Sequence, residues 1–360
     1  MKIQRGARRV LLGIWILFSA GGCVEKTGTE PPVSPEVLLI LPSNFPPPVQ
    51  DMSNNPLTVK GVALGKKLFY DGILSRDGSI ACGNCHIQAS AFTHHSHDVS
   101  HGIDDRLGRR NGLPVFNMLW QKNFFWDGGV HNLDMTPLNA LENPVEMDEK
   151  LPNVLEKLNN NGVYKRDFKA AFNVETITTK EFMQALSQFM ATMVSANSRH
   201  DKYVRKEAGG TLTETEVQGK RLFEQKCAAC HGTKLFTDGS FRNNGVSTEQ
   251  MLRFDKGREE ITLNADDRGK FRVPSLRNIE VTAPYMHRGQ FRKLEQVLDY
   301  YASGVTDSPT LDPLLKQNGQ LGISMSAGEK QQIIAFLKTL TDNEFLTNPK
   351  FAEPGFDLVK

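Results

Sequence analysis

Apolar residues recur every three or four positions over long stretches of this chain, which is the spacing of the buried face of an α-helix. The clearest runs are Phe182, Leu186, Phe189 and Met193, and Leu294, Val297, Leu298 and Tyr301. Two further segments, Thr213-x-x-Glu216 and Ser326-x-x-Glu329, have the pattern of a capping box, which is typical of helix starts. Signals for β-hairpins are few. The pattern predicts an all-α or mostly α fold.

A short segment occurs twice in nearly the same form. Gly-Lys-Lys-Leu-Phe stands at residues 65–69 and Gly-Lys-Arg-Leu-Phe at residues 219–223. We expect the Leu-Phe pair of each copy to end a short helix. A stretch containing two Asp-Gly pairs, residues 70–81, follows the first copy only and reads as a loop. A segment that recurs in this way suggests one structural module used twice.

The repeat divides the chain into two tandem domains. The helical pattern is interrupted at residues 208–210, where the sequence is Ala-Gly-Gly. We therefore predict an N-terminal domain at residues 49–207 and a C-terminal domain at residues 208–345. A C-terminal tail should follow at residues 346–360.

Each copy of the repeat precedes a Cys-x-x-Cys-His motif, the attachment signature of a c-type haem. The motifs are formed by Cys82, Cys85 and His86, and by Cys227, Cys230 and His231. Two thiols three positions apart lie on one face of a helical turn, so both can bond the vinyl groups of one porphyrin. The adjacent histidine supplies the proximal ligand of the iron. A zinc ribbon and thioredoxin-type dithiols are the alternatives, but the two pairs are far apart and a histidine follows each. We predict two covalently bound haem c groups.

The charge and the cysteine content of the chain limit the kinds of partner and of disulfide that can be expected. The formal net charge is only +2, which gives no reason to expect nucleic acid as a partner. Four of the five cysteines belong to the haem motifs, so no pair remains for a disulfide. The fifth, Cys23, follows a basic start and an apolar core at residues 10–18. This core is too short for the ~20 residues that a membrane-spanning helix needs.

The N-terminus is interpreted as an export signal. Residues 1–22 resemble a bacterial lipoprotein signal that is cleaved before Cys23, whose thiol would carry the lipid. The alternative is an ordinary cleaved signal that leaves a soluble periplasmic protein. Residues 23–48 are rich in proline, which favours an extended tether. Because c-type haem is attached after export, we expect the protein on the periplasmic side of a bacterial membrane, held there only by the N-terminal lipid.

Several further motifs follow one another in a fixed order. They are Arg110-Asn111, Phe125-Trp126-Asp127-Gly128, Asn143-Pro144-Val145-Glu146-Met147, Val273-Pro274-Ser275-Leu276-Arg277-Asn278 and Thr282-Ala283-Pro284-Tyr285-Met286-His287. With the two haem motifs, they make the chain similar to the bacterial di-haem cytochrome c peroxidases and their MauG-like relatives, from about Pro42 to about Asp342. The resemblance implies two cytochrome c domains, with the peroxidatic haem in the first and the electron-transfer haem in the second.

The resemblance also implies roles for individual residues. Trp126 matches the tryptophan that relays electrons between the haems; without its motif it would be interpreted as a core aromatic residue. Glu146 matches the distal residue that takes a proton from peroxide and returns it, the alternative being a surface glutamate. Asn111, Thr282 and Pro284 match the residues that hold a calcium ion, or else they are ordinary turn residues.

Tyr301 distinguishes two branches of the family that the chain resembles. Peroxidases with a high-potential second haem have a methionine ligand at this position, whereas MauG-like proteins use tyrosine. An anionic phenolate would lower the potential of that haem; the alternative is a packed tyrosine that contacts no metal. His101 lies near the position of a distal histidine and is a further candidate iron ligand. We expect His94, His95 and His97 in a solvated loop.

Three functions follow from these interpretations. The first, which we predict, is a peroxidase that reduces hydrogen peroxide to water with electrons from a small periplasmic donor such as a cytochrome c or a cupredoxin. The second is a MauG-like enzyme that uses peroxide to oxidise a tryptophan or tyrosine of a partner protein, and Tyr301 favours it. The third is a simple di-haem electron carrier, against which Glu146 argues. Thr136 and Ala140 depart from the glutamine and proline that relatives often have there. A homodimer is compatible with each function.

Overall fold

The computed structural model of the protein describes residues 38–317 and 319–355. Its α-helices are α1 (Val59–Phe69), α2 (Cys82–Cys85), α3 (Thr136–Glu142), α4 (Leu151–Asn160), α5 (Gly162–Phe172), α6 (Thr179–Thr192), α7 (Arg199–Arg205), α8 (Glu214–Lys226), α9 (Ala228–His231), α10 (Glu249–Leu252), α11 (Glu259–Thr262), α12 (Leu294–Ser303), α13 (Ala327–Lys338) and α14 (Asn343–Thr347). Its strands are β1 (Phe241–Arg242), β2 (Phe271–Arg272), β3 (Lys316–Gln317) and β4 (Gln320–Leu321).

The described residues are mostly helical, as predicted. The strands pair as two short antiparallel ribbons, β1 with β2 and β3 with β4. None of the described helices is both long and apolar enough to cross a membrane. The predicted signal peptide, residues 1–22, and the predicted lipidation site, Cys23, lie outside the described residues.

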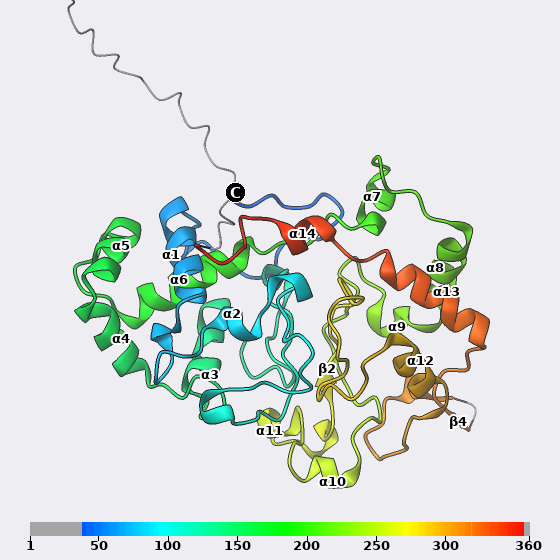
Figure 1. Cartoon of the computed structure of the whole chain (residues 1–360). Helices are drawn as coiled ribbons and strands as arrows, with labels where there is room; N and C mark the ends of the chain where they lie inside the picture. Colours follow the sequence, from blue (N-terminus) through cyan, green and yellow to red (C-terminus); the bar gives the residue numbers. More distant parts are fainter. Residues whose placement is uncertain (1–37, 318, 356–360) are drawn as a thin grey trace, which may run out of the picture. The chain divides into compact units, whose positions relative to one another are not determined.

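The internal repeat forms the same packing unit twice. In the first half α1 packs on α6, and in the second half α8 packs on α13 (Figure 1). The single glycine of each repeat lies where the two helices approach. A Cβ on Gly65 would overlap the carbonyl group of Ala185, and a Cβ on Gly219 would overlap that of Gln332. The glycine of the repeat is therefore explained by a close approach of two helix backbones, which a larger residue would prevent.

The predicted helix boundaries are confirmed in part. The first repeat ends α1 at Phe69, as predicted. The second prediction is wrong, because α8 continues beyond Phe223 to Lys226 and its last turn leads directly into the haem motif. The capping boxes at Thr213 and Ser326 begin α8 and α13 as predicted, with both side chains accepting a hydrogen bond from the third helical residue.

Two hydrophobic cores correspond to the two halves of the sequence. The larger core surrounds α1 and α6, and the smaller one surrounds α8 and α13. Part of the segment that follows α13 packs on the rest of the chain. Phe345 and Phe351 return to the larger core, where both rings pack against Phe92. Within the predicted tail, residues 346–360, Leu346 and Phe351 therefore pack on the larger core, because burying an aromatic ring is favourable, and the bounds of the tail stay a prediction.

The described end of the predicted tether is also packed. Phe45 is buried against Trp120 with ring centroids 5.1 Å apart, and the indole Nε1 of Trp120 donates a hydrogen bond of 2.6 Å to the carbonyl of Pro46. The prediction of an extended tether over residues 23–48 therefore fails at these positions. The aromatic side chain between the prolines gains more from burial than the segment gains from solvation.

A buried ion pair joins α7 to the second half. The guanidinium of Arg277 donates to both carboxylate oxygens of Asp201 at 2.8 and 2.9 Å, and Asn44 adds a hydrogen bond of 2.7 Å. His200, also in α7, packs its ring against Phe236 of the smaller core. Residues on both sides of the predicted domain boundary thus belong to one compact unit, and the boundary itself stays a prediction.

Candidate active site

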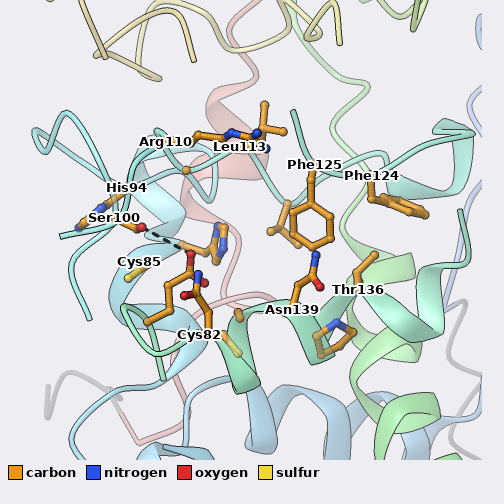
Figure 2. A pocket seen from close by; sticks show the side chains of 18 of the residues that line it. Cys82, Cys85, His94, Ser100, Arg110, Leu113, Phe124, Phe125, Thr136 and Asn139 are labelled. Atoms are coloured by element: carbon orange, nitrogen blue, oxygen red, sulfur yellow. Dashed lines mark hydrogen bonds between the residues drawn. The ribbon is translucent and has the colours of Figure 1, made fainter. Parts of the chain in front are cut away.

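The first haem motif opens into a cavity of about 880 Å³. Cys82, Cys85 and His86 line it. Figure 2 shows the two cysteines on one side of the cavity and Phe125 and Thr136 on the other. The volume lies in the upper part of the range of about 300–1,000 Å³ that is usual for cofactor pockets. The lining also includes both departures from the family pattern, Thr136 and Ala140.

Both motif histidines are held in the same way. Nδ1 of His86 lies 2.8 Å from the carbonyl oxygen of Phe92, and Nδ1 of His231 lies 3.0 Å from that of Phe236. Because a carbonyl can only accept, each Nδ1 carries the proton and each Nε2 keeps a free lone pair. Burial lowers the pKa of both rings, which keeps them neutral. A neutral imidazole oriented by its second nitrogen is what an axial ligand requires.

The two phenylalanines that supply these carbonyls share an unusual backbone conformation. Phe92 has φ 58° and Phe236 has φ 56°, in the left-handed region that bulky residues rarely adopt. Such conformations persist where the surrounding structure fixes them, often at functional sites. Our sequence analysis missed this feature, although a phenylalanine at nearly the same distance after each motif was a visible signal.

The cysteines fit haem attachment better than the alternatives. Burial raises the pKa of Cys82 to about 12, that of Cys85 to about 11 and that of Cys227 to about 12. Reactive dithiols and zinc ligands need the opposite shift, toward the thiolate. Cys82 packs against the larger core and Cys227 against the smaller one, so the pairs do not form a single zinc site. The residues present fit one covalently attached haem at each motif.

Glu146 projects into the same cavity as the first haem motif. Its Oε1 accepts a hydrogen bond of 3.5 Å from Ser100, drawn as the dashed line in Figure 2. Burial raises the pKa of this carboxyl, while hydrogen bonds from Asn143 and Ser100 oppose the rise. A Cβ on Gly102 would overlap the backbone of Glu146, so the loop after His101 approaches the acid closely. A carboxyl whose pKa is raised is better suited to accept and return a proton than an ordinary glutamate is.

Trp126 lies at the junction of the two halves. It is 8 % exposed, and its indole Nε1 donates a hydrogen bond of 2.9 Å to the carbonyl of Asn111. Its own carbonyl accepts a bond of 2.7 Å from the backbone of Arg272 in β2. The indole ring centroid lies 6.3 Å from that of His287. The side chain lines the cavity of the first motif and also contacts the second half.

Charged residues beside Trp126 tie the halves together. Arg110 donates to both oxygens of Asp255 at 2.7 Å and also pairs with Asp127. Burial opposes the charge of Asp255, yet Arg110 holds the pKa of that carboxyl below its ordinary value. This network fixes the loop that carries Trp126 onto the segment between β1 and β2.

Of the three residues of the predicted calcium site, Asn111 contacts the segment that follows the other two. The backbone amide of Asn111 donates a bond of 2.7 Å to the carbonyl of His287, just after the segment with Thr282 and Pro284. The amide group of Asn111 donates to the carbonyls of His97 and Asp98 at 3.2 and 3.1 Å. Among the described residues no group of three or more His, Cys, Asp or Glu could hold a metal ion. The calcium site stays a prediction, since amide and backbone oxygens would form it.

Tyr301 is held by a residue that the sequence analysis missed. The amide nitrogen of Asn244 donates a hydrogen bond of 3.3 Å to the phenol oxygen of Tyr301 and lies 3.4 Å from the sulfur of Met286. The Asn244 carbonyl accepts a bond of 2.9 Å from Tyr300. Burial raises the pKa of Tyr301 to about 12, and the Asn244 bond acts against this rise. No sequence signal marked Asn244, because its partners lie far along the chain.

The histidine loop differs from its prediction. His95 and His97 are exposed, but His94 is buried, so the expectation of a solvated loop is wrong for His94. Its ring stacks on His97 at 4.6 Å, and this stacking removes it from water. Burial lowers the pKa of His94 to about 4. His101 lines the first cavity, and its Nε2 lies 3.3 Å from Nδ1 of His97.

Comparisons with known proteins give one consistent result. Residues 59–209 match the sequence model of the family described as di-haem cytochrome c peroxidase. The chain is 33 % identical to the methylamine utilization protein MauG of Methylorubrum extorquens, over 91 % of this chain and 93 % of that protein. It is 30 % identical to the cytochrome-c peroxidase IdrP1 of a Pseudomonas species, over 86 % of this chain and 88 % of that one. The crystal structure of a MauG-like protein associated with microbial copper homeostasis superposes with a TM-score of 0.77 at 33 % identity, covering 87 % of this chain and 98 % of that one.

Proposed function

Because the chain belongs to the family of di-haem cytochrome c peroxidases and MauG proteins, we propose that it is an oxidoreductase that reduces hydrogen peroxide to water. Two c-type haems are its cofactors. The observation that carries the proposal is Glu146, a half-buried carboxyl with a raised pKa in the same cavity as Cys82, Cys85 and His86. An electron carrier needs no such acid, so this arrangement favours an enzyme.

The chemistry divides between the cofactor and the chain. When bound, a haem iron supplies the redox-active Lewis acid at which the O–O bond of peroxide is reduced. Reduction of one peroxide to two waters takes two electrons and two protons. Glu146 would take a proton from one peroxide oxygen and return it to the other, which is released as water, and the remaining oxygen becomes the second water with the two electrons and two protons taken up. Ser100 orients the carboxyl, and the carbonyl of Phe92 orients His86, which would hold the haem iron.

Electrons enter through the second half and pass Trp126. Support comes from the position of its buried indole, which lines the first cavity, packs near His287 and is fixed by Asn111 and the backbone of Arg272. The donor is a small periplasmic redox protein, such as a cytochrome c or a cupredoxin. A calcium ion at Asn111, Thr282 and Pro284 would stiffen this junction, and a lipid on Cys23 would hold the protein at the membrane.

The test is the reaction of the fully oxidised protein with peroxide, with and without reduced cytochrome c. We expect rapid oxidation of the donor and consumption of one peroxide for every two donor molecules. Both haems remaining six-coordinate and unreactive toward peroxide in every redox state would refute the proposal and leave an electron carrier.

Tyr301 supports a second candidate function. In this alternative, peroxide provides two oxidising equivalents that are used on a tryptophan or tyrosine of a partner protein. The phenol oxygen of Tyr301 accepts a hydrogen bond from Asn244, which would stabilise a metal-bound phenolate and the oxidised form of the second haem. Tyr301→Met should raise the potential of that haem and make activity depend on prior half-reduction. An unchanged potential would remove Tyr301 from the coordination sphere.

A further inference from the structure

Arg272 is a buried cation without a carboxylate partner among the described residues. It is 6 % exposed, and its Nε donates a hydrogen bond of 3.1 Å to the carbonyl of Phe125. The other buried arginine, Arg277, is 2 % exposed on its side chain and is paired with Asp201. Burial lowers the pKa of Arg272 to about 10, with no nearby charge that offsets it. The fold thus provides a counter-ion for one buried arginine and not for the other.

An uncompensated buried charge is costly, so the counter-ion of Arg272 should come from outside the chain. A charge moved out of water costs several kcal/mol unless it is paired and hydrogen-bonded. A guanidinium pairs best with a carboxylate, through two parallel hydrogen bonds. Arg272 lines the cavity that also contains Cys82, Cys85 and His86. Each haem carries two propionate carboxylates, and the proposed function places a haem in this cavity.

We propose that Arg272 is the counter-ion of a propionate of the haem attached at Cys82 and Cys85. The inference rests on the haem attachment of the proposed function. The same residue fixes the tryptophan loop, because its backbone amide donates to the carbonyl of Trp126 and its Nε to that of Phe125. One side chain therefore couples the charge of the first haem to the position of the residue between the two haems. Arg272 acts as a positioning residue and takes no part in proton transfer.

The test compares haem potentials in the holoprotein by spectroelectrochemistry, without peroxide. In Arg272→Gln the propionate charge is no longer balanced, so the oxidised haem is favoured. We expect the ferrous-to-ferric ratio of the His86 haem at a fixed applied potential to fall about tenfold, equal to about 59 mV for one electron. The propionate bending bands in resonance Raman spectra should also shift. The midpoint potential of the variant should rise as the pH falls, because the unpaired propionate takes up a proton.

Two further variants make the result specific. Arg272→Lys keeps the charge but loses the two-pronged geometry, so its potential should stay close to that of the wild type while the Raman bands still move. Arg253→Gln removes the same charge from an exposed residue and should change neither readout. If Arg272→Gln does not fold with both haems attached, the propionate Raman bands of Arg272→Lys test the inference alone: shifted bands support it and unshifted bands contradict it.

The possible results separate cleanly. Unchanged bands and potential in the Arg272 variants would overturn the inference, and so would a shift confined to the His231 haem. A wild-type potential that varies with chloride or phosphate concentration, and ceases to do so in Arg272→Gln, would assign a free anion instead. Because no peroxide is present, these measurements stand whether or not the protein turns over peroxide. Failure of the peroxidase assay alone would refute the proposed function and leave the propionate contact intact.

Discussion

Replacing Glu146 by glutamine should lower activity and raise stability at the same time. Glutamine keeps the size of the side chain and can still accept the Ser100 hydrogen bond, but it cannot carry a proton between the peroxide oxygens. A general acid–base residue contributes a factor of about 10²–10⁴, which is about 2.7–5.4 kcal/mol of barrier. The other carboxylates of the cavity are occupied: Asp127 pairs with Arg110, and Glu142 accepts from the Leu151 amide at 3.3 Å. We therefore expect a loss of at least a hundredfold.

The stability effect follows from the sign of the pKa shift. The pKa of Glu146 is raised by burial, so the folded state binds its proton more tightly than the unfolded state does. This stabilising contribution is present below the ordinary glutamate pKa and is lost as the pH rises through the raised pKa. At neutral pH the wild type therefore carries a cost that Glu146→Gln removes, and the unfolding midpoint of the variant should be higher.

Glu149→Gln is the matched control. Glu149 is buried three positions further on and pairs with Lys157, which lowers its pKa against the effect of burial. Its removal should destabilise the fold by about 1–3 kcal/mol and leave the rate unchanged, since Lys157 is partly exposed and loses only part of its pairing energy. The assays are peroxide-dependent oxidation of reduced cytochrome c and thermal unfolding followed by circular dichroism. A Glu146→Gln protein within tenfold of the wild-type rate would refute the reasoning.

Two further predictions concern the helix crossings and the pH profile. Gly219→Ala should destabilise the protein by about 1–3 kcal/mol, because the new methyl group overlaps the neighbouring helix backbone, which outweighs a helix-propensity gain of about 1 kcal/mol. Gly328→Ala on α13 is the control, because a Cβ at this position would contact no other atom, and it should leave the stability unchanged or raise it. Equal urea-unfolding midpoints for Gly219→Ala and Gly328→Ala would contradict the explanation by helix contact. Ser100→Ala removes a bond that lowers the pKa of Glu146, so the loss of activity at low pH should begin at a higher pH in the initial-rate profile; an unmoved profile would exclude Ser100 as a partner.

Features that depend on neighbouring residues could be predicted from the sequence. The Cys-x-x-Cys-His motifs, the capping boxes and the apolar run of α6 are local patterns with a fixed period or spacing. The glycine of the repeat was recognised as recurrent, but its reason, a close contact with Ala185 or Gln332, depends on a helix that is distant in sequence. Local sequence patterns thus identify the helices, whereas contacts between distant helices explain why a particular residue type is needed at a given position.

The features that sequence analysis missed all depend on distant parts of the chain. Asn244 meets Tyr301 from a loop 57 positions earlier, and the aromatic rings after α13 return to the first half. His94 appeared solvated because its neighbours are polar, but stacking on His97 buries it. Arg272 stands next to a family motif, and only its burial without a carboxylate made it notable.

The carbonyls of Phe92 and Phe236 hold His86 and His231 in the same way, so the two halves of the chain share one arrangement for orienting an axial histidine. The surroundings of the two motifs differ, because Glu146 lines the cavity at the first motif and the phenol of Tyr301 lies near Cys227 and Cys230 of the second. The two copies can therefore diverge in function through residues such as Glu146 and Tyr301, while the contacts that orient the two histidines stay the same. A chimaera that carries the loop of Glu146 beside the second haem motif would test whether these surroundings can be exchanged independently of the histidine contacts.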